Sequence, residues 1–151
     1  VDGQVLSQSN SINRYVGILT DLYPRDDLQA FLCDEVMEAV EDISTRIGHT
    51  IGLPEDAKKK AREELAAGLI TRFLEQFQTK LKAAGGEYFA DRRLTVADLK
   101  VVMLIRWLRS GVLDYIPKGL VDTVAPQLVG HFERVTGHPK IAEYYQRRKK
   151  A

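Results

Sequence analysis

The clearest fold signal in this sequence is the stretch Leu94-Thr95-Val96-Ala97-Asp98-Leu99. A threonine followed three residues later by an aspartate is typical of a capping box, in which each side chain accepts a hydrogen bond from the backbone amide of the other residue. Leu94 and Leu99 occupy the two positions that a hydrophobic staple uses at a helix start. The stretch therefore predicts the first turn of a long helix, which Gly111 ends.

The helix predicted after this stretch is apolar on nearly every side. Its apolar residues are Val101, Val102, Met103, Leu104, Ile105, Trp107 and Leu108. A helix that is hydrophobic all round is buried inside a protein. We therefore expect the other helices to pack around it.

Two longer helices are expected before the capping box. Residues 26–48 carry apolar positions at steps of three and four, namely Leu28, Leu32, Val36, Ala39 or Val40, Ile43 and Ile47. A second such pattern begins at Pro54, ends at Gly85-Gly86 and consists of Leu65, Leu69, Phe73, Phe77 and Leu81. The short connection between the two patterns predicts an antiparallel helix pair.

Shorter elements are expected at both ends of the chain. Ser9 is predicted to cap a helix over residues 9–19, whose apolar face is Ile12, Tyr15, Val16 and Leu19. Helices are also expected over residues 118–124, 126–136 and 140–149. Asp2-Gly3 is a strong hairpin-turn signal, and Gln4-Val5-Leu6 then resembles a strand without its partner strands. The sequence thus predicts an all-α bundle with a remnant strand or hairpin at its N-terminus.

The composition narrows the class of protein. With 151 residues, 44% hydrophobic and 28% charged, the chain suits one globular domain rather than a disordered or membrane protein. A net charge of +1 does not point to nucleic acid or to a membrane as the partner. The single cysteine excludes a disulfide framework and favours a cytoplasmic location. The polar start at Val1 does not read as a secretory signal.

Few side chains are arranged for catalysis. Cys33 is expected in mid-helix beside Asp34 and Glu35, which favours a structural thiol. The three histidines lack metal-ligand spacing, and we expect no metal site; they are His49, His131 and His138. The acidic residues of the second helix form either a solvated face or a site for a cationic group. These residues are Asp34, Glu35, Glu38, Glu41 and Asp42.

Gln8 and Ser9 lie between the expected strand and the expected helix. Free backbone amides point outward at such a helix start and can bind a carboxylate. The Gln8 amide and the Ser9 hydroxyl would add side-chain hydrogen bonds. The same pair also fits a plain helix cap, and the residues alone leave both interpretations open.

Residues 1–16 resemble the last hairpin and third helix of the thioredoxin-like domain of cytosolic glutathione transferases. The shared pattern is Asp-Gly, a short strand, Gln-Ser and then Ile-x-Arg-Tyr, with Val16 in place of the usual leucine. The capping box looks like the folding motif of the family's helical domain, and His138-Pro139-Lys140-Ile141 looks like its late helix-entry motif. The resemblance, strongest to the sigma, alpha, mu and pi group, implies a remnant of the thioredoxin-like domain over residues 1–20 and a helical domain over residues 21–151.

The resemblance also implies a function. Members of the family join the glutathione thiolate to electrophiles, or use it for isomerisation and peroxide reduction, without a cofactor. Gln8 and Ser9 match the residues that hold the γ-glutamyl carboxylate and amine. In the adjacent pair Glu41-Asp42, Asp42 matches the acid that reaches the ammonium across a homodimer interface. The expected partners are glutathione and a small hydrophobic electrophile, in the cytoplasm, with no nucleic acid and no membrane.

This sequence departs from the family pattern in the part that carries catalysis. The family's catalytic tyrosine, serine or cysteine belongs to the first strand, which this chain does not include, so we expect the chain alone to be inactive. For the electrophile pocket we expect Ser44, Ile47, Gly48 and Leu104. An alternative is a non-catalytic member of the family that serves as a structural or assembly module. An unrelated bundle would have to match all three motifs by chance.

Overall fold

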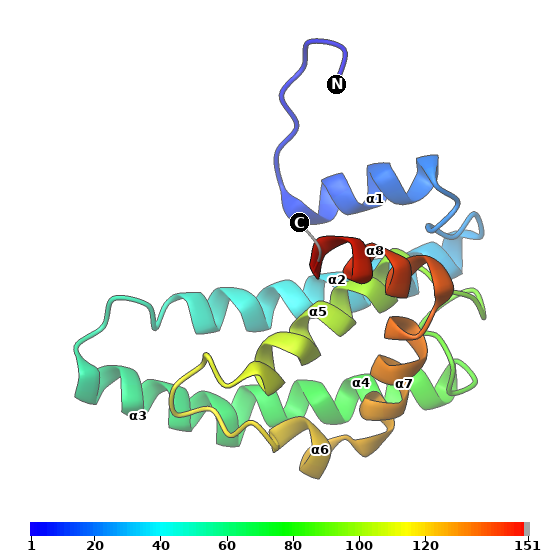
Figure 1. Cartoon of the computed structure of the whole chain (residues 1–151). Helices are drawn as coiled ribbons and strands as arrows, with labels where there is room; N and C mark the ends of the chain where they lie inside the picture. Colours follow the sequence, from blue (N-terminus) through cyan, green and yellow to red (C-terminus); the bar gives the residue numbers. More distant parts are fainter. Residues whose placement is uncertain (150–151) are drawn as a thin grey trace.

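The computed structural model describes residues 1–149, and all of their regular structure is helical (Figure 1). In chain order the elements are α1 (Ser9–Leu19), α2 (Asp27–Gly48), α3 (Glu55–Leu65), the π-helix η1 (Ala66–Ile70), α4 (Thr71–Ala83), α5 (Val96–Ser110), α6 (Leu120–Val124), α7 (Pro126–Thr136) and α8 (Pro139–Lys149). The all-α bundle predicted from the sequence is confirmed, and every expected helix is present.

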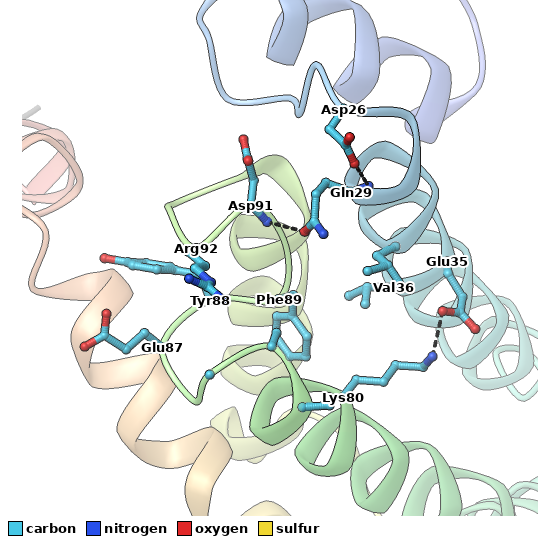
Figure 2. Close-up of a pocket in the computed structure, with 14 residues that line it drawn as sticks. Asp26, Gln29, Glu35, Val36, Lys80, Glu87, Tyr88, Phe89, Asp91 and Arg92 are labelled. Carbon is cyan, nitrogen blue, oxygen red and sulfur yellow. Dashed lines mark hydrogen bonds and ion pairs between the residues drawn. The ribbon is translucent and has the colours of Figure 1, made fainter.

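Helix α2 runs antiparallel to the continuous rod of α3, η1 and α4, as the short connection between them predicts (Figure 1). Near one end of the pair, Lys80 Nζ of α4 donates to Glu35 Oε2 of α2 at 2.6 Å (Figure 2). The largest side chains of the core are at most 1% exposed and include Met37, Ile43, Ile47, Ile70, Leu74, Phe77, Ile105, Leu108 and Leu128. The buried face of α5 packs mainly along α2. The helix is not buried on every side as its apolar composition predicts, because Met103 is 53% exposed.

The rod contains a π-helical turn, which the apolar pattern does not predict. A π-turn holds more residues than an α-turn and so changes which side chains face the core. The buried residues around it are Ala66, Ile70 and Leu74. The positions expected there are only half-buried, namely Leu65, Leu69 and Phe73. Phe77 and Leu81, beyond the π-turn, are buried as predicted.

Helix α1 packs on the bundle with the opposite face to the one predicted. Tyr15, Val16 and Leu19 are 40%, 47% and 66% exposed, so most of the expected apolar face points outward. Gly17 is buried instead, and a Cβ added there would lie 2.9 Å from a methyl group of Val96. The glycine lets α1 approach the start of α5 closely, which leaves the larger apolar residues uncovered.

The first residues form the predicted turn but not the predicted strand. Gln4 N donates to the Val1 carbonyl at 2.8 Å, with Asp2 and Gly3 at φ values of 49° and 78°. These two left-handed residues suit a hairpin turn. Residues 4–6 are not in a strand, because the described chain contains no strand to pair with them, and Val5 is 96% exposed.

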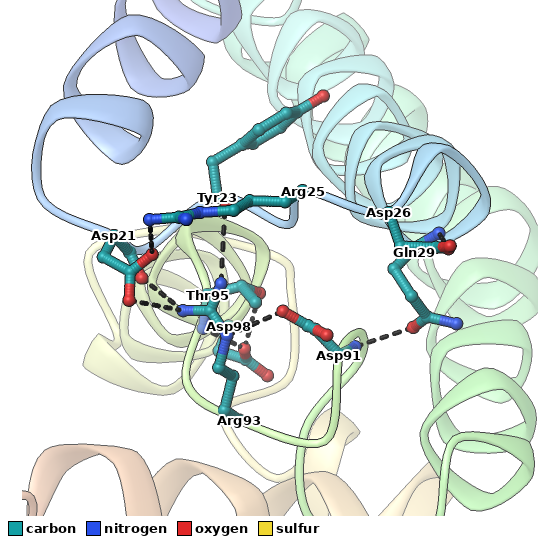
Figure 3. Close-up of polar contacts among 9 residues, drawn as sticks. All are labelled: Asp21, Tyr23, Arg25, Asp26, Gln29, Asp91, Arg93, Thr95 and Asp98. Atoms are coloured by element: carbon teal, nitrogen blue, oxygen red, sulfur yellow. Dashed lines mark hydrogen bonds and ion pairs between the residues drawn. The ribbon is translucent and has the colours of Figure 1, made fainter.

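The capping box at the start of α5 is present and buried (Figure 3). Asp98 Oδ2 accepts from the backbone amide of Thr95 at 2.8 Å and from its hydroxyl at 2.7 Å. Asp98 Oδ1 accepts from the amide of Phe89 at 3.0 Å and lies 2.9 Å from His131 Nε2. Thr95, Asp98 and His131 are fully buried, so the box joins the start of α5 to α7 and to the preceding loop.

We predict that Thr95→Ala lowers the free energy of unfolding by about 1–2 kcal/mol, because a buried cap is lost. The melting temperature should fall by roughly 2–4 °C for each kcal/mol in a domain of this size. Thr79→Ala is the matched control, since Thr79 is an exposed helical threonine whose hydroxyl bonds only to the Glu75 carbonyl. Thermal unfolding by circular dichroism measures both variants. Equal melting temperatures would contradict a stabilising role for the box.

Candidate functional site

The start of α1 has an unusual backbone. Gln8 occupies the cap position with φ 71° and ψ 113°, and its side chain makes no capping hydrogen bond. A positive φ at a residue other than glycine is strained and is common at functional sites. Ser9 is the first helical residue rather than the cap, which corrects the sequence-based expectation by one position. The first-turn amides therefore remain without a side-chain cap, as a bound carboxylate would require.

The Ser9 hydroxyl takes part in a cluster that joins three helices. It donates to Glu41 Oε2 of α2 at 2.9 Å. Lys100 Nζ of α5 donates to the same oxygen at 2.7 Å, lies 3.3 Å from Ser9 Oγ and also contacts Asn10 Oδ1. These donors, Lys100 first and then Ser9, lower the pKa of the Glu41 carboxyl below its ordinary value of 4.5. Lys100 is absent from the sequence-based site because it lies 91 residues from Ser9 in the chain. Asn10 directly follows Ser9, but no sequence pattern indicated that its side chain faces Lys100.

The acidic residues of α2 separate into two groups. Three of them pair with cations on other helices: Asp34 with Arg14 at 2.8 Å, Glu35 with Lys80 and Glu41 with Lys100. Glu38 and Asp42 are exposed, and within residues 1–149 neither makes an ion pair. The carboxylate of Asp42 is therefore open to an outside cation, while its neighbour Glu41 is already engaged.

Arg14 fastens α1 to α2. Its Nη2 lies 2.8 Å from Asp34 Oδ2, and its Nε donates to the Tyr23 hydroxyl at 3.2 Å. The hydrogen bond to Asp34, followed by that to Tyr23, raises the pKa of the Arg14 guanidinium above its ordinary value. The position of Ser9 relative to α2 thus depends on an ion pair nearby as well as on the Ser9 cluster.

The residues expected to line the electrophile pocket lie in different environments. Ile47 and Leu104 belong to the core, 0% and 3% exposed. Ser44 is half-buried, and its hydroxyl donates to the Val40 carbonyl at 2.9 Å. Gly48, also half-buried, is the last residue of α2. None of the four lines the cleft described below, and their assignment to an electrophile pocket stays a prediction.

An open cleft of about 930 Å³ lies elsewhere, between the start of α2 and the end of α4 (Figure 2). Its apolar lining includes Leu32, Val36 and Phe89, and the Glu35–Lys80 ion pair crosses one side. It meets α2 at residues 26–36, whereas the Ser9 cluster meets α2 at Glu41. Of the acidic residues that the sequence suggested as a cation site, Glu35 lines the cleft, whereas Gln8, Ser9 and Asp42 do not. The cleft is lined by two segments that are distant in the sequence, residues 26–36 and 80–92, so no local sequence pattern predicts it.

The thiol of Cys33 and the imidazole of His131 are buried. Cys33 is fully buried, and burial raises the pKa of its thiol to about 11, so it is not a thiolate at neutral pH. His131 contacts Asp98, as described above. Within residues 1–149 there is no group of three residues that could hold a metal ion. No helix in that range combines the length and the apolar composition that crossing a membrane requires.

Comparison with known proteins places the chain in a family. The model of "Glutathione S-transferase, C-terminal domain" matches residues 41–148. The chain is 29% identical over 146 residues to glutathione S-transferase A2 of Bos taurus, covering 97% of this chain and 63% of that protein. It is 32% identical over 141 residues to glutathione S-transferase P 1 of Xenopus laevis, covering 93% and 62%. The chain thus spans less than two thirds of these relatives.

A solved structure agrees with the fold. That of prostaglandin synthase D of Nilaparvata lugens superposes with a TM-score of 0.84 at 23% identity, covering 98% of this chain and 71% of the other. At that identity the likeness supports the arrangement of the helices and nothing further.

We predict that Glu41→Gln destabilises the chain at pH 7 and that the effect becomes smaller as the pH falls below the ordinary pKa of a glutamate, because the folded-state pKa of Glu41 is lowered. A carboxyl whose pKa is lowered on folding stabilises the protein above its unfolded pKa, and the contribution is lost as the pH falls through the folded pKa. Because Glu41 is 44% exposed, we expect a difference of less than about 1 kcal/mol at pH 7. Urea unfolding measures it, with Glu38→Gln as the unpaired control. A difference that persists unchanged at pH 3.5 would contradict the ion pair.

Proposed function

Because this chain belongs to the glutathione S-transferase family, we propose that it is the helical part of an enzyme that transfers the thiol of glutathione to small electrophiles. Isomerisation or peroxide reduction would be side activities of the same thiol. The proposed setting is the cytoplasm, and no metal or other cofactor is proposed. The observation that carries the proposal is that the chain has both an uncapped helix start at Gln8-Ser9 and an exposed carboxylate, Asp42, on α2.

The γ-glutamyl group of glutathione presents one carboxylate and one ammonium. The carboxylate needs donors, which the first-turn amides of α1, the Ser9 hydroxyl and the Gln8 amide supply. The ammonium needs an acceptor with a free negative charge. Glu41 already accepts from Lys100, so Asp42 is the better acceptor. This division of roles explains why two adjacent acids occur at this place on α2.

A homodimer would bring Asp42 to the glutathione of the partner subunit. Leu28 and Phe31, at the start of α2, are 63% and 62% exposed. Glu35, Glu38 and Asp42 continue from them at steps of four, three and four residues, which places all five along one side of the helix. Large exposed apolar residues on such a stripe favour burial against another surface. A second copy of the chain covering this stripe is the proposed partner.

The outward face of α1 supports the proposed division into domains. Tyr15, Val16, Ile18 and Leu19 are between 40% and 66% exposed on one short helix. A thioredoxin-like domain to which residues 1–20 belong would cover this face, leaving residues 21–151 as the helical domain. The catalytic hydroxyl or thiol would come from that domain. The electrophile would lie near the end of α2, beside Ser44, Ile47, Gly48 and Leu104.

We predict that the chain of 151 residues alone shows little or no conjugation of glutathione to chloronitrobenzene, while a longer protein that includes the thioredoxin-like domain does. Loss of one preorganised donor to a reacting group typically costs on the order of 10²–10³ in rate. A spectrophotometric assay of the two proteins tests this expectation. Robust turnover by the chain alone would overturn it. Glutathione binding without turnover in the longer protein would instead favour a structural or assembly module.

We predict that Asp42→Asn weakens glutathione binding by the longer protein without unfolding it. The change keeps the shape but removes the charge, and a charge-assisted hydrogen bond contributes roughly 1.5–3 kcal/mol. Glu38→Gln, one turn away on the same side of α2, should have little effect. Isothermal titration calorimetry of both variants measures the difference. Equal, small effects of the two substitutions would mean that the acidic residues on this side of α2 are only a solvated face and do not bind glutathione.

A further inference from the structure

Lys100 is a largely buried cation at the junction of α1, α2 and α5. Its side chain is only 12% exposed, and its ammonium contacts three oxygens, those of Ser9, Asn10 and Glu41. Lys100 lies two residues after Asp98, within the helical segment that the capping box starts. Its backbone position is therefore held by the buried box, while its side chain reaches the start of α1.

The charges in this cluster balance. Within residues 1–149, Glu41 is the one anion in contact with Lys100, and Ser9 and Asn10 are neutral. A serine hydroxyl has a single proton to donate, and here Ser9 donates it to Glu41. A carboxylate bound at the start of α1 that uses the Ser9 hydroxyl as one of its donors must receive that same proton. The internal carboxylate of Glu41 and an incoming carboxylate thus compete for one donor.

We infer that Lys100 is a positioning residue for the γ-glutamyl carboxylate, acting through Glu41 and Ser9; this inference rests on the proposed function. With the ammonium in place, Glu41 keeps a charged donor when the Ser9 proton turns to the incoming carboxylate. Without the ammonium, Glu41 is an unpaired anion that retains the Ser9 proton and repels the ligand's carboxylate. Lys100 therefore releases Ser9 for binding without itself contacting the substrate.

If Lys100 acts through Glu41 and Ser9, a second substitution at Glu41 should restore binding. A role of Lys100 in packing alone predicts no such recovery. Lys100→Met should raise the dissociation constant for glutathione about tenfold, the equivalent of one charge-assisted hydrogen bond. Adding Glu41→Gln should recover much of that loss, because the unpaired anion is gone. Lys100→Arg, which keeps the charge, should stay within about threefold of the wild type. A residue that acts through packing alone would show no recovery in the double variant.

Calorimetric titration of glutathione into the longer protein tests the inference. Lys58→Met is the matched control, because Lys58 is 20% exposed and pairs with Glu55 at 2.7 Å on α3, away from Ser9; it should bind like the wild type. A Lys100→Met variant that binds like the wild type, or a double variant as weak as the single one, would overturn the role of Lys100. If the wild type itself does not bind glutathione, the proposed function fails instead. Circular dichroism checks that each variant is folded.

Discussion

The structure depends above all on the buried carboxylate of Asp98. Its two oxygens accept from the amide and hydroxyl of Thr95 and the amide of Phe89, and His131 Nε2 lies within hydrogen-bond distance. A buried charge is tolerated only when it is fully hydrogen-bonded. One side chain thus determines where α5 begins, how the loop before it turns and how α7 packs.

The start of α5 also fixes the position of the candidate site at the start of α1. Val96, the first residue of α5, donates its amide to the Leu22 carbonyl at 2.9 Å and packs closely against Gly17 of α1. Lys100, one turn further, contacts both Ser9 and Glu41. The geometry at the start of α1 is therefore set from α5. Stability and the proposed binding of glutathione would be coupled here, because they use successive turns of one helix.

The sequence predicts well what local patterns control. Helix positions followed from apolar periodicity and from turn or capping residues such as Thr95 and Gly111, and the helices form where expected. The sequence-based predictions fail where the structure of a segment depends on residues distant in the sequence. The apolar face of α1 is exposed because a glycine, Gly17, makes the closer contact, and residues 4–6 lack a partner strand. The π-turn in the rod shifts the core positions by a residue, which periodicity cannot anticipate.

In the candidate site too, local features could be predicted from the sequence, whereas features that depend on distant contacts could not. Local sequence identified Ser9 at a helix start and the acids of α2, because helix ends and charge runs are local features. The charge pattern does not separate Glu41 from Asp42, and only the family resemblance singled out Asp42. The physical distinction depends on Lys100, which lies 59 residues beyond Glu41 in the chain. A salt bridge between helices changes the role of a carboxylate from binding an outside cation to fixing the fold. Charge pattern alone therefore locates an acidic face, and only the packing shows which of its members remain available.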